Sequence, residues 1–478
     1  MRIFLINLIL IAIFSNLEAN RVNITKDLPF VDLNIDGKKF RIERIQDTNN
    51  KLKNDYTKTS RPTPPFFIQP FSVAKGVKTV GELDLISFLQ HELREKKGLL
   101  IDARLPKWYK NGTIPFAKNI PFSIFYSKKR ASQIIEIFKI LDIEFKNKKF
   151  DFKDAKKLLI FDNGPWCAQA SYLIKALIKL GYPKDKILYY RGGMQFWQIV
   201  GLNVIIPKED NSKLSKITND FLKDILYENR VINLSGRQRM LTQKITKDAI
   251  ALSFDKDAKS DLIASIKLYD KTLNGLLNGD SDLLLKKESN AILIKKIKDL
   301  KKSWDIFKKE LDSLINNKGD IQAIIDENLI MLDLSNELVQ LYKKEFGQNY
   351  IQKARSNIVD LAGRERMLLQ KMAKEKFLVE LNIDKEKNQK NLQKSIELFE
   401  SSLDILIDGS SKNKIPKTSN RDLLKRYKSI RRDFQLFKEN LNKHNLNISY
   451  LKAINKTSNT LLKRMNESVK IAEELKEY

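Results

Sequence analysis

Residues 232–243 read INLSGRQRMLTQ, and residues 359–370 read VDLAGRERMLLQ. The shared positions lie 127 residues apart (364 − 237), and they are Gly236/Gly363, Arg237/Arg364, Arg239/Arg366, Met240/Met367 and Gln243/Gln370. Further on, SIKLYDKTLNGLLNGD at 265–280 is echoed 130 residues later (395 − 265) by SIELFESSLDILIDGS at 395–410. A period this long indicates a duplicated domain, because solenoid repeats span only about 20–50 residues.

The region around these repeats has a helical pattern throughout. From about residue 215 onward glycine and proline become rare, and apolar residues recur with the helical period. The stretch at 221–252 predicts one long amphipathic helix, and the rest of each repeat predicts several more. We therefore expect an all-helical bundle in each of two tandem copies, 215–345 and 346–478.

The preceding region alternates between short apolar runs and helical patterns. GLLIDAR (98–104), KLLIFD (157–162) and ILYYRGG (187–193) read as buried strands, whereas 79–93 and 170–182 have helical spacing. Buried strands separated by helices are typical of a mostly parallel sheet with both faces covered. The sequence thus predicts an α/β domain with flanking helices.

We place this α/β domain at residues 76–206 and a smaller segment before it at 20–75. Within that segment, VDLNIDGKKFRIERI (31–45) alternates around an Asp-Gly pair, which predicts a hairpin. TSRPTPPFFIQP (59–70) contains four prolines and predicts an ordered, non-helical connector.

The first residues have the pattern of an export signal. In MRIFLINLILIAIFSNLEAN, one arginine is followed by an apolar run and then by small and polar residues. We expect a signal peptide at 1–19, with cleavage after Ala19 and a periplasmic mature chain; retention as an N-terminal anchor is the alternative. No later stretch is long and apolar enough to span a membrane, so passing a signal inward would require another protein.

The charge and the scarcity of histidine and cysteine narrow the function classes. The net charge is +29, but the lysines are spread along the chain without a nucleic-acid motif. We therefore expect partners that are small anions or anionic surfaces, and no nucleic acid. His91 and His444 are far apart, so no histidine-based metal site or cofactor is expected. Cys167 is the only cysteine, which rules out an intramolecular disulfide.

Cys167 lies in FDNGPWCAQASYLIKAL, between a predicted strand and the following helix. Backbone amides and the positive end of a helix favour a thiolate at such a position. The sequence therefore predicts a reactive thiol there. The alternative is a small buried side chain without chemistry.

Residues 79–204 resemble a rhodanese-like domain. The resemblance rests on LLIDAR (99–104), WYKNGTIPFAKNIPF (108–122), the strand–loop–helix around Cys167, and YYRGGMQFWQIVGL (189–202). It implies sulfur transfer, in which a loop cysteine takes a sulfane sulfur and passes it to a thiophilic acceptor. By this resemblance Cys167 is the catalytic residue of a thiosulfate or persulfide sulfurtransferase. The loop that would bind the anion comprises Asp162, Asn163, Gly164, Trp166, Ala168 and Gln169.

The chain departs from the rhodanese pattern at the strand end. Family cysteines usually follow the strand directly, where this chain has Asp162 and Asn163, and the arginine that ends the family loop is missing. Some members carry further cysteines that match Asp162, Thr63 and Phe67. An aspartate at the sulfur-accepting position would repel thiosulfate and cannot carry a persulfide. These departures favour a catalytically altered domain.

Two arginines near the loop are further candidates for anion binding. Arg104 ends the segment LLIDAR, and Arg191 lies in YYRGG. A guanidinium group at either position would attract an oxyanion. A salt bridge between Arg104 and Asp102 is the structural alternative.

The repeated helical segment resembles the sensor domain of type IV pilus methyl-accepting transducers, which is similar to the ligand-binding domain of nitrate-sensing histidine kinases. The residues that carry this resemblance are A/S-G-R-x-R-M-L-x-Q at 235–243 and 362–370. In the nitrate sensors, the arginine before the methionine binds the anion across a subunit interface. The resemblance therefore implies an anion-binding role for Arg239 and Arg366, with Gln243 and Gln370 on the same faces.

The spacing of the motif is compatible with such a role. Ser235, Arg239 and Gln243 are four residues apart, so they line one face of a helix, and a guanidinium group offers several donors to an oxyanion. If the two copies pack as a pseudo-dimer, Arg239 and Arg366 could hold one anion between them. Ordinary solvent-exposed or salt-bridged arginines are the alternative.

Two functional readings follow. The first is an exported sulfurtransferase-type protein whose helical half binds a small sulfur or nitrogen oxyanion. The second is a catalytically altered rhodanese fold that acts as a periplasmic oxyanion-binding or adaptor protein for a membrane signalling or redox partner. An adaptor for pilus or chemoreceptor machinery rests on analogy alone.

Overall fold

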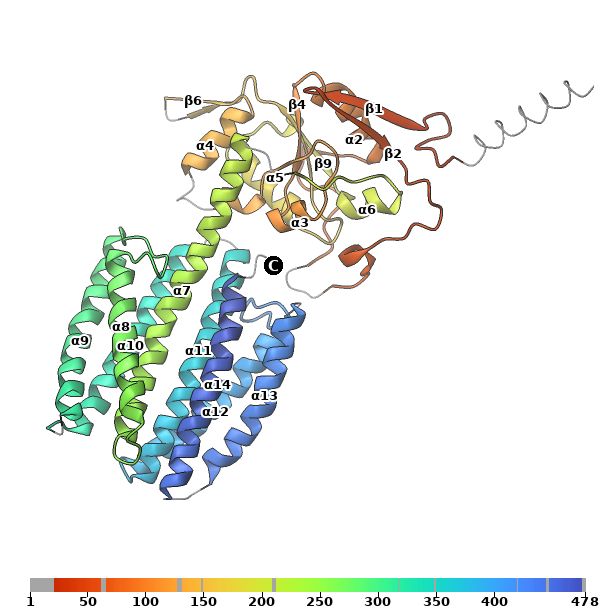
Figure 1. Ribbon diagram of the computed structural model, residues 1–478. Helices are drawn as coiled ribbons and strands as arrows, with labels where there is room; N and C mark the ends of the chain where they lie inside the picture. The colour runs from red at the N-terminus through yellow and green to blue at the C-terminus, as the bar shows by residue number, and fades with distance from the viewer. Residues whose placement is uncertain are drawn as a thin grey trace, which may run out of the picture. The chain divides into compact units, whose positions relative to one another are not determined.

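The computed structural model describes residues 21–61, 66–126, 131–147, 149–208, 212–316, 318–347, 350–418, 420–443 and 447–474 (Figure 1). The predicted signal peptide lies outside these residues. Contacts divide the chain into two compact units, the first ending at Leu222 and the second beginning at Lys223. Among the described helices, none is long and apolar enough to cross a membrane.

The first unit begins with the predicted hairpin. Strands β1 (Phe30–Ile35) and β2 (Lys38–Glu43) pair antiparallel. Asp36 and Gly37 between them have φ angles of 49° and 74°. Two left-handed residues in a two-residue loop match the twist of the flanking strands, which is why Asp-Gly favours this turn. The hairpin prediction is confirmed.

A five-stranded parallel sheet forms the centre of the first unit, in the order β3-β9-β8-β4-β5. The strands are β3 (Lys78–Thr79), β4 (Gly98–Asp102), β5 (Lys118–Asn119), β8 (Lys157–Phe161) and β9 (Ile187–Tyr190). The three predicted strands are β4, β8 and β9, which lie in the middle of the sheet and are almost fully buried. The predicted α/β class is therefore confirmed.

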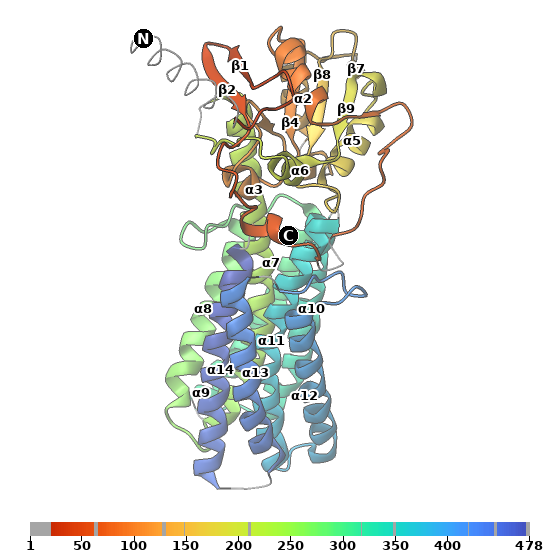
Figure 2. The same ribbon diagram turned by 90° about the vertical axis from the view of Figure 1, so that its right-hand side faces the viewer.

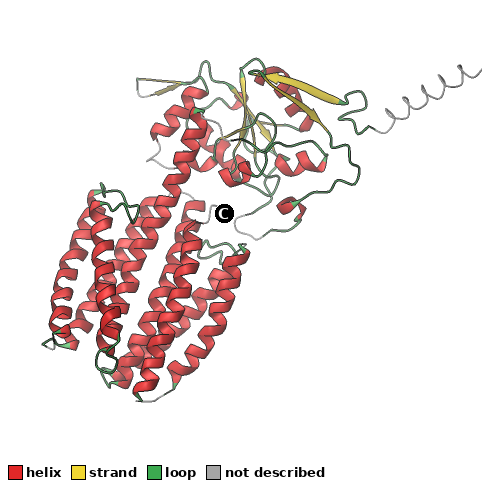
Figure 3. Cartoon of the chain, viewed as in Figure 1, coloured by secondary structure: helices red, strands yellow, loops and turns green. Residues whose placement is uncertain are grey.

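Helices flank this sheet, and a second small hairpin lies beside it (Figure 3). The helices are α2 (Glu82–Phe88), α3 (Pro106–Lys110), α4 (Ala131–Ile140), α5 (Gln169–Lys179) and α6 (Gly193–Ile199). The hairpin is β6 (Glu144–Lys146) with β7 (Lys149–Asp151), and single turns of other helix types lie at η1 (Asn54–Thr57), η2 (Leu89–Leu93), η3 (Phe122–Tyr126) and η5 (Lys184–Lys186). The helix expected at 79–93 is thus α2 followed by a π-helical turn.

The second unit is built from long helices, as the sequence predicts. The helices are α7 (Lys213–Ala251), α8 (Ala258–Asn278), α9 (Ala291–Ile315), α10 (Ile321–Phe346), α11 (Tyr350–Glu380), α12 (Lys385–Asp408), α13 (Arg421–Asn442) and α14 (Ile448–Glu474). Helices α7–α10 form the first copy and α11–α14 the second. Helix α7 starts earlier than the long helix predicted at 221–252 and ends one residue before it.

The two copies share one hydrophobic core. Buried residues of both copies belong to a single cluster, which includes Leu234, Leu241 and Ile245 from α7 as well as Leu368 and Met372 from α11. Helices α7, α11 and α14 lie side by side in both views (Figures 1 and 2). The copies therefore pack on each other within the chain.

The turns after α8 and α12 have the same backbone conformation in the two copies. Gly279 and Gly409 end these helices with φ angles of 84° and 81°. A Cβ at either position would meet backbone atoms within 3.0 Å, so both conformation and space require glycine there. Each turn is closed by one bridge, Asp280 with Leu285 and Ser410 with Ile415.

Candidate functional site

The loop around Cys167 connects β8 to α5. Its backbone folds back on itself, since the amide of Cys167 donates to the carbonyl of Gly164 at 2.9 Å. The Cys167 Sγ accepts a contact from Nδ2 of Asn163 at 3.7 Å. Only 1% of Cys167 is exposed, so the thiol lies inside the loop rather than at its surface.

Asp162 occupies the place where this loop could hold an anion. Its carboxylate is fully buried, and it accepts hydrogen bonds from the amides of Gly164 at 3.0 Å and Ala170 at 2.8 Å. Burial raises its pKa to about 7. The loop amides and the start of α5 are therefore already bound to a carboxylate of the chain itself.

The surroundings of Cys167 disfavour the thiolate that the sequence predicts. Burial raises the pKa of the thiol, and the negative charge of Asp162 raises this pKa further. Hydrogen bonds from the loop favour the thiolate, but they do not offset these two effects. The thiol is protonated at neutral pH in this arrangement.

The connector before the α/β domain lies against the cysteine loop. The amides of Phe67 and Gln69 donate to the carbonyls of Trp166 and Pro165, at 3.2 and 2.7 Å. The guanidinium of Arg61 lies 3.4 Å from the centre of the Trp166 ring. Phe67 is half exposed, and the predicted position Thr63 lies outside the described residues. The connector therefore restricts access to the loop.

Arg104 is a structural residue in this arrangement. It is 1% exposed, and its guanidinium donates to both carboxylate oxygens of Asp102 at 2.6–3.1 Å. It also donates to the Tyr56 hydroxyl at 2.8 Å and to Oδ1 of Asn163 at 3.3 Å. The structure thus gives Arg104 the salt bridge to Asp102 that is the alternative to anion binding.

The remaining loop candidates also bind parts of the protein. Arg191 donates to the carbonyl of Gln69 at 2.8 Å. Trp166 Nε1 donates to the Gln195 side chain at 2.6 Å, and Gln169 accepts from the amide of Leu105 at 3.0 Å. Ala168 directly precedes α5, without a side-chain cap.

The repeated arginines of the second unit reach across the boundary between its two copies. Arg239 Nη2 donates to Oδ1 of Asp360 at 2.7 Å and to its carbonyl at 3.4 Å. Arg366 Nη2 donates to Oδ1 of Asn233 and to its carbonyl at the same two distances. Asn233 and Asp360 occupy matching positions of the repeat, so the two contacts are related by pseudo-symmetry.

The two guanidinium groups lie close together at Gly363. A Cβ on this glycine would be 3.3 Å from Arg366 Nη2 and 3.7 Å from Arg239 Nη2. The two nitrogens are therefore no farther apart than the sum of these distances. Both arginines are almost fully buried, at 2% and 3% exposure. The structure thus brings together the two arginines that the sequence singles out.

The partners of the two arginines differ in charge. Asp360 also accepts from Lys343 Nζ at 2.7 Å, whereas Asn233 donates to the carboxylate of Glu473 at 2.5 Å. Burial alone would raise the pKa of Asp360, but the cations around it outweigh that effect and hold its pKa to about 2. Asp360 is therefore ionised at neutral pH.

Arg366 faces an amide where Arg239 faces a carboxylate. Burial lowers the pKa of Arg366 to about 9, and the charges of Arg237 and Arg239 lower it too. The Nε atoms of Arg239 and Arg366 are buried and, in the described part of the chain, have no hydrogen-bond partner. A site with this charge and with free donors would favour an anion.

Gln243 and Gln370 bind the last helix of their own copies. Gln243 Nε2 donates to the Asn328 side chain at 3.1 Å, and Gln370 Nε2 donates to the carbonyl of Ser458 at 3.0 Å. Ser235, Arg239 and Gln243 are all buried on one face of α7, as the spacing predicts. The glutamines therefore anchor the motif helices within their bundles.

Comparison with protein families identifies both units. The family of rhodanese-like domains matches residues 87–199. The family described as type IV pili methyl-accepting chemotaxis transducer N-term, PilJ, matches residues 222–326 and 350–460. The chain joins a rhodanese-like domain to two PilJ-type segments. No curated protein matches the chain.

The two PilJ-type segments contain both copies of the arginine motif, and one of the buried positions at which the copies differ has a carboxylate. Glu365, between the two arginines of the second copy, stands where the first copy has Gln238. It is fully buried, neither carboxyl oxygen has a hydrogen-bond partner among the described residues, and burial raises its pKa well above the usual value. Sequence reasoning missed this residue, although a carboxylate inside an apolar helix face is a recognisable signal.

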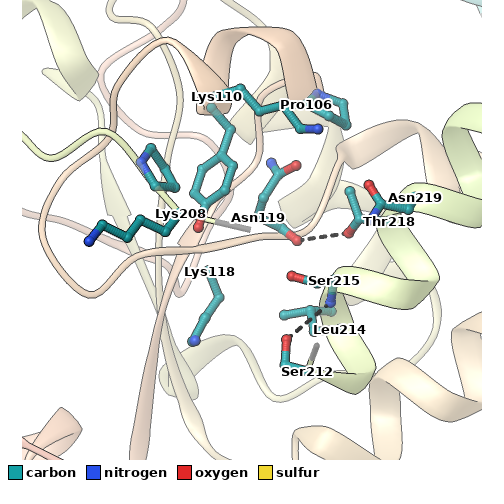
Figure 4. A pocket seen from close by; sticks show the side chains of 12 residues that line it. Pro106, Lys110, Lys118, Asn119, Lys208, Ser212, Leu214, Ser215, Thr218 and Asn219 are labelled. Carbon is teal, nitrogen blue, oxygen red and sulfur yellow. Dashed lines mark hydrogen bonds between the residues drawn. The ribbon is translucent and has the colours of Figure 1, made fainter. Parts of the chain in front are cut away.

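The rhodanese-like unit also contains a cavity away from the cysteine loop (Figure 4). It has a volume of about 140 Å³ and lies between α3, β5 and the start of α7. Thr218 Oγ1 donates to the Asn119 carbonyl at 3.3 Å across it, and the side chains of Lys110, Lys118 and Lys208 line it. No sequence motif indicated this cavity.

Proposed function

We propose that the PilJ-type unit binds a small sulfur or nitrogen oxyanion between Arg239 and Arg366, and that the protein reports the presence of this anion to a signalling partner. The observation that carries the proposal is the convergence of two buried guanidinium groups beside Gly363. Within the described ranges, Arg239 has a direct carboxylate partner and Arg366 has none.

The chemistry of the pair suits a trigonal or tetrahedral oxyanion. A guanidinium group donates several hydrogen bonds in one plane and stays charged at neutral pH. In this proposal Asp360 acts as an internal anion that holds Arg239 until the ligand replaces it. Because Asp360 belongs to α11 and Arg239 to α7, such a replacement would change the link between the copies and couple binding to their packing.

In the same proposal the rhodanese-like domain binds or docks and does not transfer sulfur. Three observations support this role: the buried thiol of Cys167, its raised pKa, and the Asp162 carboxylate bound to the loop amides. An anionic donor such as thiosulfate would have to displace this carboxylate.

We further propose that the chain is exported through a signal at residues 1–19 and works in the periplasm. A membrane signalling or redox protein would then receive its signal. The PilJ match supports a signalling partner, because that family comprises chemotaxis transducers. Secretion of the full chain from a bacterial host, followed by N-terminal sequencing, tests the signal; an unprocessed cytoplasmic chain would refute it.

Titration calorimetry of the full chain tests the oxyanion site. We expect heat with at least one of nitrate, nitrite, thiosulfate and sulfite, and no heat for the Arg239→Ala/Arg366→Ala double variant. Arg432→Ala is the control, because this arginine is 79% exposed and should leave binding unchanged. Since two buried deletions could disturb folding, Arg239→Lys/Arg366→Lys is a second variant, checked by circular dichroism. Unchanged binding in both folded double variants would refute the site.

Sulfur transfer by Cys167 is the second candidate function. The contact from Asn163 to the thiol and the position before α5 favour it. Thiosulfate would pass its outer sulfur to the thiolate and release sulfite, and cyanide would then take that sulfur as thiocyanate and restore the thiolate. Thiocyanate formation that is lost in Cys167→Ser would establish this activity, whereas equal rates for both proteins would exclude it.

A further inference from the structure

The second unit has a cavity whose lining is rich in cations. It lies between α10, α11 and the turn that follows α12, and its volume is about 620 Å³. Six cationic side chains line it, and they are Lys343, Lys344, Lys353, Arg364, Lys412 and Lys414. Asp360 is the single carboxylate in the lining, and it is already bound to Lys343 and Arg239. The cavity therefore has a large positive charge.

Several of these cations have no charged partner in the part of the chain that the structure describes. In the described ranges of the chain, Lys353, Lys412 and Lys414 form no salt bridge. Arg364 donates to Ser402 at 3.2 Å, but its Nε is buried without a partner. Like charges at close range repel one another, so an anion that enters the cavity would be stabilised by several of them at once.

The corresponding turn of the first copy lacks the two lysines of this turn, whereas Arg364 has a counterpart in Arg237. The turn after α8 has Asp282 and Leu284 where the turn after α12 has Lys412 and Lys414, at the same 130-residue separation (412 − 282). Both turns have the same bridge, so the backbone is conserved while the charges are not. The general lysine content of the chain would raise the charge of both turns equally. The charge is therefore a property of this one cavity.

The helices beside the two turns also differ in charge between the copies. Lys343 of α10 contacts Asp360, whereas the helix in the matching place, α14, presents Glu473 to Asn233. The motif helix of the second copy, α11, is thus surrounded by cations, whereas the motif helix of the first copy, α7, faces a carboxylate. The two copies therefore share one fold but have charges of opposite sign beside their motif helices.

We propose that this cavity binds a small polyanion, a molecule with several negative charges carried by phosphate or carboxylate groups. A single nitrate or sulfite would fill only a small part of the volume and contact few of the cations. Pockets of about 300–1,000 Å³ bind organic ligands of ordinary size. The cavity shares Asp360 with the arginine pair, but Arg239 and Arg366 are not among its lining residues, so the two anions would bind to different cations.

Calorimetry of the full chain with tripolyphosphate and with citrate tests the proposal and distinguishes a phosphate ligand from a carboxylate ligand. The decisive variant is Lys412→Asp/Lys414→Leu, which installs the residues of the first copy in an exposed turn and should leave the fold intact. We expect this variant to weaken binding of at least one probe by about tenfold or more, because charge-assisted contacts are lost. The control is Lys302→Asp/Lys309→Leu, which makes the same charge change on the exposed face of α9 and should bind like the wild type.

Two results would overturn the proposal. One is that neither probe binds, and the other is that the variant and its control weaken binding equally, since the effect would then come from net charge. Nitrate is used to test the proposed oxyanion site independently of the polyanion site. We expect its heat to be insensitive to Lys412→Asp/Lys414→Leu, so that loss of polyanion binding and loss of nitrate binding are independent outcomes.

Discussion

Asp360 accepts a hydrogen bond from Arg239 across the boundary between the two copies, at 2.7 Å. Asn233, at the matching position, accepts the equivalent bond from Arg366 at the same distance. The geometry of the two contacts is the same, but only one of them is an ion pair. Together with Lys343 beside Asp360 and Glu473 beside Asn233, this difference distributes charge unevenly across the centre of the helical unit.

Asp360→Asn should destabilise the helical unit. The side chains of Arg239 and Asp360 are only 3% and 13% exposed, and removal of one partner of a buried pair costs about 3–5 kcal/mol. Urea unfolding followed by circular dichroism measures this loss. In the control, Asp404→Asn removes the exposed partner of Arg431, and we expect a loss of less than about 1 kcal/mol.

Asp360→Asn should also strengthen binding of the oxyanion, if Asp360 is the internal competitor that we propose. Without this carboxylate, Arg239 and Lys343 lose their common partner. The added ligand would then restore part of the lost stability. A variant that binds the anion more weakly than the wild type would contradict this competitor role.

Glu365→Gln should stabilise the helical unit at neutral pH. The pKa of Glu365 is raised by burial, so the folded state binds its proton more tightly and the free energy of unfolding falls as the pH rises above the usual carboxyl range. Glutamine is the residue of the first copy, Gln238, and it cannot ionise. We expect a gain of about 1–3 kcal/mol at pH 8 and a smaller one at pH 5, by urea unfolding. A gain that is equal at both pH values would show that ionisation is not its cause.

The stability of the rhodanese-like unit should depend on the ionisation of Asp162. Its folded-state pKa of about 7 lies above the usual 3.8, so the folded unit binds more protons between these values. Stability should therefore fall as the pH rises from about 4 to about 7, by up to about 1.4 kcal/mol per pH unit, and level off above that range.

Tryptophan fluorescence during urea unfolding measures this dependence, because Trp108, Trp166 and Trp197 all lie in the rhodanese-like unit. Asp162→Asn should flatten the profile. The variant Asp32→Asn is the control, since that carboxylate is exposed on the hairpin. A profile that stays steep in Asp162→Asn would assign the titration to another group.

Arg104→Met should unfold or strongly destabilise the rhodanese-like unit. The change would leave Asp102 buried without its cation, at a cost of about 3–5 kcal/mol. Arg41→Met on the exposed hairpin is the control and should cost less than about 1 kcal/mol. The same fluorescence measurement applies. A stable variant that had lost only anion binding would instead assign Arg104 to a ligand site.

Local sequence patterns predicted those elements whose conformation depends only on neighbouring residues in the chain. The Asp36-Gly37 turn follows from the backbone freedom of two adjacent residues, and the buried strands follow from continuous apolar runs. The shared face of Ser235, Arg239 and Gln243 follows from helical spacing alone. These features needed no knowledge of how the elements pack.

Features that depend on packing could not be predicted in this way. Asp360 is 121 residues from Arg239, and their contact depends on how α7 and α11 cross. The connector is bound to the cysteine loop through backbone groups of Phe67 and Gln69, which carry no side-chain signal. Cys167 was expected to be reactive because its position in the chain is visible in the sequence, whereas the burial that raises its pKa is not.

The union of both copies in one polypeptide has an evolutionary consequence. In a symmetric homodimer every substitution appears twice, so an acid cannot face one arginine while an amide faces the other. Here the gene encodes positions 233 and 360 separately, and each side of the interface is free to diverge. Because the two copies are covalently linked, they are always present in equal amounts. Their association therefore does not depend on the concentration of the protein in the cell.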